Sequence, residues 1–301
     1  MGYDLTGKVV LITGPARGIG AETARLLARR GARLSLVGLE PERLVALAAE
    51  LGAGHVWFEC DVTDQAALER AVAGTVGAFG RIDVVIANAG VASNRTVAAG
   101  PVEALVRTVE VNLVGVVRTV SATVEHVTAA RGYYLLVSSA AAIAPLPGLS
   151  TYAAAKSGVE QFGNVLRLEL KHKGVRVGVA HPSWIDTDMV RDARRDLTTF
   201  DEVLATLPWP FNSVTPVGVC AEAFVRAVAR HSRKVYVPRS LRPFSAARSL
   251  LASSLAEFVM GRNARRLVPK AEREAVALGR AFGANSVETV KRAGGGDAAG
   301  T

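Results

Sequence analysis

The chain has few of the residues that define several classes of protein. Of its 301 residues only 2 are cysteine, and Cys60 and Cys220 lie far apart in the sequence. This usage excludes a disulfide-rich scaffold and is typical of a reduced cytosolic protein, in which Cys60 would pack at the end of a strand. The 5 histidines have no metal-ligand spacing, so no metal site is predicted.

The sequence also shows no long hydrophobic run and no recognisable N-terminal signal. No apolar run approaches the roughly 20 residues that a helix needs to cross a bilayer. The first strand-like run begins at Lys8 without a cleavage pattern before it, so we expect a cytoplasmic protein. With 50% hydrophobic residues the chain can bury a large core, and we expect one domain with an appendage.

Acidic and aromatic residues are scarce in the last fifth of the chain. Residues 242–301 carry ten Lys and Arg against five Asp and Glu, which supplies +5 of the net charge of +9. This segment has few aromatic residues and no nucleic-acid motif, so no nucleic acid is predicted as a partner. A solvated basic face is the first interpretation, and contact with anionic lipid or with a partner is the second.

Apolar runs alternate with helical patterns through most of the chain. The runs are Lys8–Ile12, Arg33–Val37, His55–Glu59, Ile82–Ala87, Tyr133–Ser138, Val175–Ala180 and Lys234–Val237. Seven such runs with helices between them predict an α/β fold: a single Rossmann-like, doubly wound domain over residues 1–240, with a seven-stranded parallel sheet flanked by helices. Right-handed crossovers would gather the turns after the strands along one edge, where ligands bind.

Local signals mark the boundaries of other elements. Thr63-Asp64 and Thr215-Pro216 are typical of helix starts. Residues 187–213 mix charged and aromatic side chains, and we interpret them as a mobile substrate lid, although a static insertion would have the same composition.

Residues 241–301 are predicted to form a basic helical extension, with disorder over 294–301. Apolar residues follow helical spacing at Leu250, Leu251, Leu255, Phe258 and Val259. Such a face packs on the parent domain or on an oligomer partner, and attachment to a membrane surface is the alternative.

Tyr152 and Lys156 stand four residues apart in a predicted helix, so they share one helical face. A nearby ammonium favours phenolate and lowers the tyrosine pKa from its usual value of about 10. A tyrosine placed in this way can exchange a proton near neutral pH. Taken alone, the pair is equally typical of a partly buried aromatic residue beside a solvated lysine.

A glycine-rich turn follows the first apolar run. Thr13–Gly20 lies between this run and a helical pattern that continues to Arg30. A strand, a glycine-rich turn and a helix N-terminus are the arrangement that accepts a pyrophosphate. The spacing is Gly-x-x-x-Gly-x-Gly rather than the commoner Gly-x-Gly-x-x-Gly, and without further motifs it could be an ordinary tight turn.

Together these residues resemble the short-chain dehydrogenase/reductase family, from about Leu5 to about Pro238. Thr13–Gly20 is similar to the family's cofactor loop, Asp61-Val62 to its adenine contact, and Asn88-Ala89-Gly90 to its sheet-steadying motif. His181–Met189 is similar to the nicotinamide segment, except that Ser183 replaces glycine. The resemblance implies a cofactor site at Gly14, Arg17, Gly18, Ile19, Gly20, Gly38, Asp61, Val62, Asn88, Ala89, Gly90, Tyr152, Lys156, Pro182, Ile185 and Thr187.

The resemblance also implies a catalytic set of Asn112, Ser139, Tyr152 and Lys156, with Ser139 thirteen residues before Tyr152. Tyr152 would exchange the substrate proton while a hydride passes between the carbinol carbon and the nicotinamide. Lys156 would depress the Tyr152 pKa and bond the nicotinamide ribose, and Ser139 would hold the carbonyl oxygen. Asn112 would bend its helix and hold a water linked to Lys156. Considered singly, Ser139 could cap a strand end and Asn112 could bond only to backbone.

The preference for NADP(H) or NAD(H) depends on the end of the second strand. Gly38 stands where an acidic residue would repel a 2′-phosphate, and Arg17 could pair with that phosphate. Leu39 and Glu40 argue for NAD(H), because Leu39 replaces a frequent arginine and Glu40 could reach a ribose hydroxyl. The pattern favours NADP(H).

Aromatic and apolar residues in and before the lid suggest the substrate. Trp184 and Met189, with Trp209 and Phe211, would line or cover the site with apolar surface. With Ser139 as a further substrate contact, they predict a hydrophobic, lipid-like or steroid-like secondary alcohol or ketone. Alternatively, these side chains only pack the lid.

Two further expectations concern partners and function class. The resemblance implies a homodimer or homotetramer through the helices of Asn112 and Tyr152. A cofactor-binding scaffold or redox sensor, using the basic tail to bind a partner or membrane surface, is the alternative to an enzyme. Drift from catalysis would be expected to lose a member of the catalytic set, and none is missing.

Overall fold

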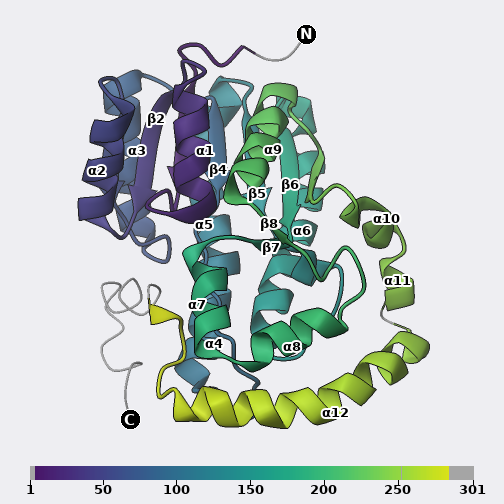
Figure 1. The fold of residues 1–301 in the computed structure, drawn as a ribbon. Coiled ribbons are helices and arrows are strands. Elements are labelled where there is room, and N and C mark those ends of the chain that lie inside the picture. The colour runs from purple at the N-terminus through teal and green to yellow at the C-terminus, as the bar shows by residue number, and fades with distance from the viewer. Residues whose placement is uncertain (1–3, 252, 285–301) are drawn as a thin grey trace.

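The computed structural model describes residues 4–251 and 253–284, and in this part of the chain seven strands form one parallel sheet (Figure 1). The order is β3-β2-β1-β4-β5-β6-β9. The strands are β1 (Val9–Thr13), β2 (Arg33–Gly38), β3 (Val56–Glu59), β4 (Val84–Ala87), β5 (Tyr133–Val137), β6 (Arg176–Pro182) and β9 (Lys234–Val237). The predicted fold class is therefore confirmed. Each predicted run matches one strand, and the two agree to within two residues at either end.

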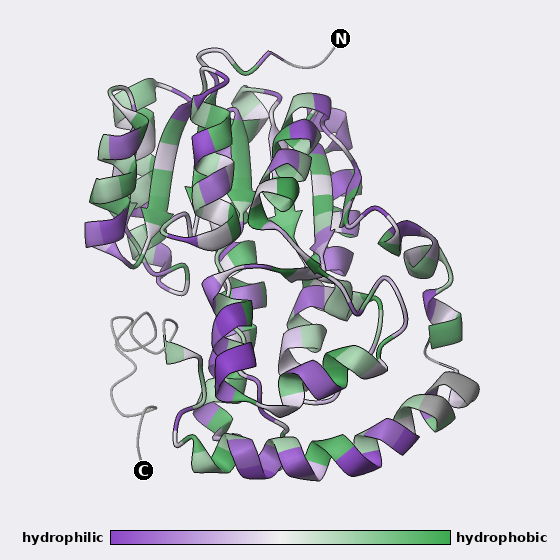
Figure 2. Ribbon diagram, in the orientation of Figure 1, coloured by the Kyte–Doolittle hydropathy of each residue, from purple (hydrophilic) through white to green (hydrophobic). Residues whose placement is uncertain are grey.

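The strands are continuous apolar runs because helices cover both faces of the sheet. In β1, Leu11 faces one apolar core, whereas Val10 and Ile12 face the other, as the two-residue period of a strand requires. Figure 2 shows the sheet as largely hydrophobic. Helices α1 (Gly18–Ala28), α2 (Pro41–Leu51) and α9 (Val217–Arg230) cover one face, and α3 (Gln65–Phe79), α5 (Gly115–Ala129) and α6 (Ser150–Glu169) cover the other (Figure 1).

The order of the strands reverses between β1 and β4. The chain builds β1, β2 and β3 outward in one direction and then returns to place β4 on the other side of β1, where Val10 pairs with Val84. The loops after β1 and β4 therefore diverge, and in a doubly wound sheet a crevice for ligands forms at this point.

Both predicted helix starts are confirmed. Asp64 caps α3 by accepting a hydrogen bond from the backbone N of Ala67 at 3.1 Å, and α9 begins at Val217 directly after Pro216. The helix α4 (Val102–Val109) leads into a π-helical turn, η1 (Glu110–Val114), before α5.

The predicted lid segment contains regular structure. Helices α7 (Asp188–Asp196) and α8 (Thr199–Thr206) lie between β7 (Trp184–Ile185) and β8 (Val214–Thr215), two short strands that pair with each other. This pairing was not predicted from the sequence, because strands of two residues have no measurable period. It brings the beginning and the end of the segment together.

The C-terminal extension is helical, as predicted. It comprises α10 (Leu241–Ala246), α11 (Arg248–Leu251) and α12 (Ser254–Ala277), and α12 curves past α8 (Figure 1). In the predicted apolar stripe Leu250 and Phe258 are exposed and Leu251 is half-buried. The side chains of Leu255 and Val259, and the tail 294–301, lie outside the described residues.

Candidate active site

A cavity of about 340 Å³ opens at the carboxyl ends of the central strands. The loop after β1 and the segments after β3 and β4 line one end, which we call the loop end. Residues from the loop after β5, the lid segment and the C-terminal extension line the other, which we call the apolar end. The predicted residues on its wall are Gly14, Arg17, Gly18, Ile19, Asp61, Val62, Asn88, Ala89, Gly90, Asn112, Ser139, Tyr152, Lys156, Pro182, Trp184, Ile185, Thr187, Met189 and Phe211.

Two glycines shape the loop end. Gly14 and Gly18 have φ values of +65° and +56°, which L side chains rarely adopt. A Cβ atom on Gly14 would lie 2.8 Å from Cα of Ala89, so the loop after β1 sits directly on the loop after β4. The backbone here can therefore approach a ligand closely in front of the N-terminus of α1, an arrangement that suits a pyrophosphate.

Asn88 joins the same two loops. Its Nδ2 donates to the carbonyl oxygens of Thr13 at 3.1 Å and Gly14 at 3.0 Å, and its backbone N donates to Oγ1 of Thr13 at 3.0 Å. Both side-chain donors are therefore used to tie β4 to β1, and the loop end is a rigid sheet edge.

Two residues predicted to bind the cofactor, Gly20 and Gly38, do not lie on the cavity wall. Gly20 packs inside the first turn of α1 against Pro15 and Asn88. Gly38 ends β2 beneath Pro15, whose Cδ lies 3.5 Å from where a Cβ atom on Gly38 would be. Leu39 and Glu40 line the cavity instead, because the chain turns toward it one residue later than the motif suggested.

Glu40 and Arg17 form an ion pair at this point, with Oε1 and Nη2 2.5 Å apart. The carboxylate also lies 3.1 Å from Nε of Arg43. From the sequence, Arg17 and Glu40 favour opposite cofactors. The structure brings them together, so each restrains the other.

Asp61 also has a charged partner that sequence reasoning missed. Its Oδ2 accepts a hydrogen bond from Nη2 of Arg107 at 2.6 Å, and its Oδ1 accepts from the backbone N of Thr63 at 2.9 Å. Arg107 lies on α4 and lines the cavity. No signal in the sequence links it to Asp61, because 46 residues separate the two.

Ser139, Tyr152 and Lys156 meet where β5 ends beside α6. Ser139 follows the strand, and its Oγ lies 3.4 Å from the carbonyl oxygen of Pro182. Nζ of Lys156 donates to the carbonyl oxygen of Val137 at 2.9 Å and lies 5.6 Å from the ring centroid of Tyr152. Ser138, the neighbour of Ser139, donates instead to the carbonyl oxygen of Lys156 at 2.7 Å, and this bond anchors α6 to the strand.

The electrostatics differ from the prediction for Tyr152. Burial raises the pKa of Tyr152, and a hydrogen bond with Ser139 offsets only part of that rise. Burial also lowers the pKa of Lys156 to about 7. The predicted lowering of the Tyr152 pKa is therefore wrong for the protein alone, because the same desolvation that penalises phenolate also removes the ammonium charge meant to stabilise it.

Asn112 lies inside the π-helical turn η1 and is fully buried. Its Nδ2 donates to the carbonyl oxygens of Val91 at 2.6 Å and Thr108 at 2.8 Å. Within residues 4–251 and 253–284, its Oδ1 has no hydrogen-bond partner. A buried acceptor of this kind on a cavity wall, in a π-helical turn, is typical of a functional position.

The apolar end combines residues from distant segments. Trp184 donates from Nε1 to the carbonyl oxygen of Phe211 at 2.9 Å, which places both on the wall with Met189. Trp209 is 66% exposed and is not on the cavity wall, so of the two predicted roles, lining or covering the site, the structure does not support lining. Leu251 of α11 and Met260 of α12 line this end instead. Leu251 belongs to the predicted apolar stripe, but nothing in its spacing pointed to the cavity.

Several other groups bear on the chemistry. Both cysteines are buried and free, and burial raises the pKa of the Cys60 thiol on the cavity wall to about 12, so it is not a nucleophile. In the part of the chain that the structure describes, no cluster of His, Cys, Asp or Glu is placed to hold a metal ion. In that same part, no helix is both long enough and apolar enough to span a membrane.

Comparisons with known proteins place the cavity in context. A family model described as short chain dehydrogenase matches residues 8–198. A relative named 11-beta-hydroxysteroid dehydrogenase-like 2, from Arabidopsis thaliana, is 31% identical over 242 residues, which cover 78% of this chain and 75% of that protein. D-threitol dehydrogenase from Mycolicibacterium smegmatis is 36% identical over 191 residues, covering 62% of this chain and 74% of that protein.

A solved structure is similar to the chain in fold. It is an alcohol dehydrogenase from the archaeon Thermococcus sibiricus in complex with 5-hydroxy-NADP, with a TM-score of 0.65 and 26% identity. The match covers 76% of this chain and 95% of that one.

Proposed function

The chain belongs to the short-chain dehydrogenase/reductase family, and from this premise we propose that it interconverts a hydrophobic secondary alcohol and its ketone with NADP(H). Membership makes it an oxidoreductase that acts on CH–OH groups with a nicotinamide cofactor. The observation that carries the proposal is the meeting of Ser139, Tyr152 and Lys156 between the loop end and the apolar end of one cavity.

The loop end suits a dinucleotide. The positive φ values of Gly14 and Gly18 leave room for a pyrophosphate in front of α1, and the buried Oδ1 of Asn112 offers an acceptor near Lys156. Gly14, Gly18 and Asn88 would hold the pyrophosphate side, and Tyr152 and Lys156 the nicotinamide ribose. When bound, the nicotinamide ring accepts or supplies the hydride.

Tyr152 is proposed to be the proton donor and acceptor. Because burial raises its pKa, Tyr152 is a phenol at neutral pH and can protonate an alkoxide as the ketone is reduced. In the reverse direction Tyr152 must first lose that proton. The small fraction of Tyr152 present as phenolate then limits oxidation at neutral pH. Ser139 would donate to the same substrate oxygen and hold it beside the phenol.

Lys156 would set the balance between these two directions. Its pKa of about 7 leaves it divided between ammonium and amine near neutral pH. An anionic ligand at the loop end would favour the ammonium, and the ammonium would in turn favour the Tyr152 phenolate. The lowering of the tyrosine pKa would then be a property of the loaded enzyme.

The cofactor preference is proposed to depend on the ion pair of Arg17 and Glu40. A 2′-phosphate would draw Arg17 from Glu40 into a bidentate contact, whereas a 2′-hydroxyl would donate to Glu40 and leave the pair intact. Gly38 brings no acidic side chain to repel the phosphate. We therefore favour NADP(H), and the NADP analogue in the archaeal alcohol dehydrogenase supports this choice.

The substrate is proposed to be lipid-like or steroid-like. Trp184, Met189, Phe211, Leu251 and Met260 present apolar surface next to Ser139. The named relatives diverge on this point, since one is named for a hydroxysteroid and another for threitol. The apolar wall favours the first, because threitol hydroxyls would find few partners there.

The test is a nicotinamide absorbance assay over a library of alcohols and ketones with both cofactors. We expect hydrophobic ketones to be reduced faster than small polar ones, and NADPH to be preferred over NADH. Faster turnover of small polyols would reject the substrate proposal. No turnover of any compound would favour the alternative of a cofactor-binding scaffold or sensor.

We also propose a domain division and a self-association surface. Residues 1–240 would form the catalytic and cofactor-binding domain with the lid at 187–213, and 241–301 the extension. Exposed Val117 on α5 and Val165 and Leu168 on α6 support a homodimer or homotetramer through these helices. Light scattering of wild type and Leu168→Glu tests this, because a charge on that face should shift the mass toward the monomer.

Peripheral membrane contact is proposed for the extension of a cytoplasmic protein. Leu250 and Phe258 are 68% and 63% exposed, and the guanidinium of Arg262 lies 5.0 Å from the Phe258 ring centroid. Apolar side chains beside a cation suit an anionic lipid surface. Sedimentation with phosphatidylserine vesicles should lose binding in Phe258→Ser, and equal binding by the variant would exclude this face.

A further inference from the structure

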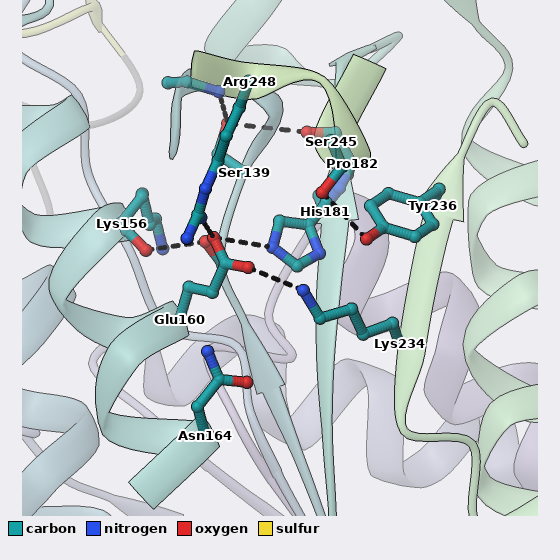
Figure 3. A network of polar contacts seen from close by, with 12 residues as sticks. Ser139, Lys156, Glu160, Asn164, His181, Pro182, Lys234, Tyr236, Ser245 and Arg248 are labelled. Atoms are coloured by element: carbon teal, nitrogen blue, oxygen red, sulfur yellow. Dashed lines mark hydrogen bonds and ion pairs between the residues drawn. The ribbon is translucent and has the colours of Figure 1, made fainter. Parts of the chain in front are cut away.

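The helix α6 carries a second buried ionisable group, Glu160, one turn after Lys156 (Figure 3). Its side chain is only 3% exposed. The carboxylate does not reach the cavity wall, and the proposed reaction has no use for it. A buried carboxylate in this position requires partners, because desolvating an unpaired charge is expensive.

Three groups from separate elements surround this carboxylate (Figure 3). Lys234, at the start of β9, donates from Nζ to Oε1 at 2.9 Å. Arg248, at the start of α11, donates from Nη1 to Oε2 at 3.1 Å. Nε2 of the fully buried His181, at the end of β6, lies 3.5 Å from Oε2.

These partners keep Glu160 ionised. Burial by itself raises the pKa of its carboxyl, but polar contact with His181 and the hydrogen bond and charge of Lys234 outweigh burial and lower the pKa to about 2. Glu160 is therefore a permanent anion at neutral pH. It can therefore hold a cation from the extension at neutral pH.

Arg248 is the partner that does not belong to the sheet domain. It begins the short helix α11, and Leu251, one turn later on α11, lines the apolar end of the cavity. The preceding helix α10 is held nearby by a hydrogen bond from Oη of Tyr236 to Oγ of Ser245 at 2.9 Å. Phe244 of α10 also packs edge to face against Phe211 of the lid, with ring centroids 5.3 Å apart.

The extension has a second attachment beyond the cavity wall. Lys270 of α12 pairs with Glu202 of α8, and Glu274 accepts from the backbone N of Thr199 at 3.1 Å. Met260 lies between the two attachments on the cavity wall. The two wall residues, Leu251 and Met260, thus lie in the sequence between an attachment to α6 through Arg248 and an attachment to the lid through α12.

The two attachments differ in burial. Lys270 and Glu202 are 41% and 43% exposed, so water screens their attraction. Arg248 is also half-exposed, but its acceptor Glu160 is buried and immobile. The pair at Glu160 is therefore the better anchor, and it is the nearer one to Leu251.

We propose that Arg248 is a specificity-determining positioning residue, which binds Glu160 on α6 and so holds Leu251 and Met260 as an apolar wall of the cavity that contains Ser139. This inference rests on the proposed function, because it names what holds the apolar wall against which a longer hydrophobic substrate would pack. Arg248 touches neither substrate nor cofactor. It acts by fixing the extension to the helix that carries Tyr152 and Lys156.

The test compares Arg248→Met with Lys234→Met. Both variants remove one cation from Glu160 and keep the aliphatic stem, but only Arg248 belongs to the extension. The probes are methyl ketones of increasing chain length with NADPH. We expect Arg248→Met to lose about fivefold of the kcat/KM preference for the longer ketones, chiefly through KM, which is the effect of a pair worth about 1 kcal/mol. Lys234→Met should keep the wild-type preference, and Arg248→Lys should restore most of it.

A second measurement does not depend on turnover. Amide hydrogen exchange over residues 246–260 should be faster in Arg248→Met than in wild type or Lys234→Met, since a released segment opens more often. Equal exchange in all three proteins, or an equal loss of chain-length preference in both methionine variants, would overturn the proposal. If the wild type reduces no ketone, the proposed function fails, while the exchange data still decide whether Arg248 anchors the extension.

Discussion

The loop end and the apolar end of the cavity are held in place by different kinds of contact. At the loop end, the backbones of neighbouring parallel strands meet, as where Gly14 lies against Ala89, and the side chain of Asn88 bonds to the carbonyls of Thr13 and Gly14. At the apolar end, the side chain of Trp184 bonds to Phe211, and Leu251 of the extension joins Phe211 through a cluster of apolar side chains. A site built from backbone atoms tolerates few substitutions. A wall built from side chains can change its shape by substitution while the fold persists. We expect variants at the two ends to differ accordingly.

The largest effect is expected between the two ends, at Tyr152. Tyr152→Phe removes the proton carrier and should lower kcat by about 10³-fold in both directions. The thermal midpoint should stay near the wild-type value, and the cofactor affinity should fall only slightly, because one hydrogen bond to the ribose is lost. Steady-state kinetics with a fluorescence titration of NADPH measures both. Retained turnover would show that another group exchanges the proton.

Lys156→Met should lower kcat by about 10²-fold while stabilising the protein alone. Burial lowers the pKa of Lys156 from 10.5 to about 7, so between these values the unfolded chain holds a proton that the folded protein has lost. The stability of the wild type therefore rises with pH from about 7 toward 10.5, and a penalty for the buried ammonium is fully present below pH 7.

Methionine at this position removes both the penalty and its pH dependence. Thermal midpoints measured from about pH 6 to about pH 9 should show a variant that is more stable at the acidic end and converges on the wild type at the basic end. A difference that does not change with pH would mean that Lys156 stays charged in the folded protein.

Gly14→Ala should damage the loop end. The added methyl combines a φ of +65° with an approach of 2.8 Å to Cα of Ala89, and we expect a loss of about 2 kcal/mol in unfolding free energy with weaker NADPH binding. Gly7→Ala is the matched control, since its φ is +70° with no atom within 4 Å of the new methyl. Denaturant titration of both separates strain from contact. Equal losses would mean that the two loops can move apart.

Arg17→Ala should change cofactor choice rather than stability. We expect KM for NADP to rise about tenfold and KM for NAD to change little, because only the 2′-phosphate needs the guanidinium. Glu40→Gln should act in the opposite direction by releasing Arg17 from its 2.5 Å ion pair. Initial rates with both cofactors provide the comparison, and equal effects of Arg17→Ala on the two KM values would remove Arg17 from the site.

Leu251→Ala should have the smallest effect and would define the apolar end. The smaller side chain enlarges the cavity at this wall, which should shift the kcat/KM preference toward bulkier ketones by about fivefold with little change in thermal midpoint. Leu250→Ala is the control, since its side chain is 68% exposed on the same short helix. Identical selectivity in both variants would place the wall elsewhere.

Much of the loop end could be predicted from residues close together in sequence. The continuous apolar run in β1 and the glycines of residues 13–20 identified the crevice, because strand, turn and helix are consecutive there. Tyr152 and Lys156 could be paired because helical periodicity relates residues four apart. The two glycines that miss the wall, Gly20 and Gly38, show the limit of this reasoning, since a motif does not tell which of its atoms face a ligand.

The apolar end and the charges could not be predicted in the same way. Trp209 is exposed to solvent, although an aromatic residue in the lid segment was expected at the cavity. Leu251 and Met260 reach the cavity from a segment whose sequence resembled a surface helix. The pKa of Tyr152 rises rather than falls because burial, which residue spacing does not reveal, outweighs the hydrogen bond with Ser139.

By itself, the sequence determined the parallel sheet, the crevice at its edge and the residues that meet there, since these depend on periodicity and on short turns between consecutive elements. Only the tertiary structure decided the Arg17–Glu40 pair, the direction of the Tyr152 and Lys156 pKa shifts, and the wall supplied by the extension. Arg248 and Glu160 are 88 residues apart. Desolvation and contacts over such separations arise only when the chain is packed, so no local pattern encodes them.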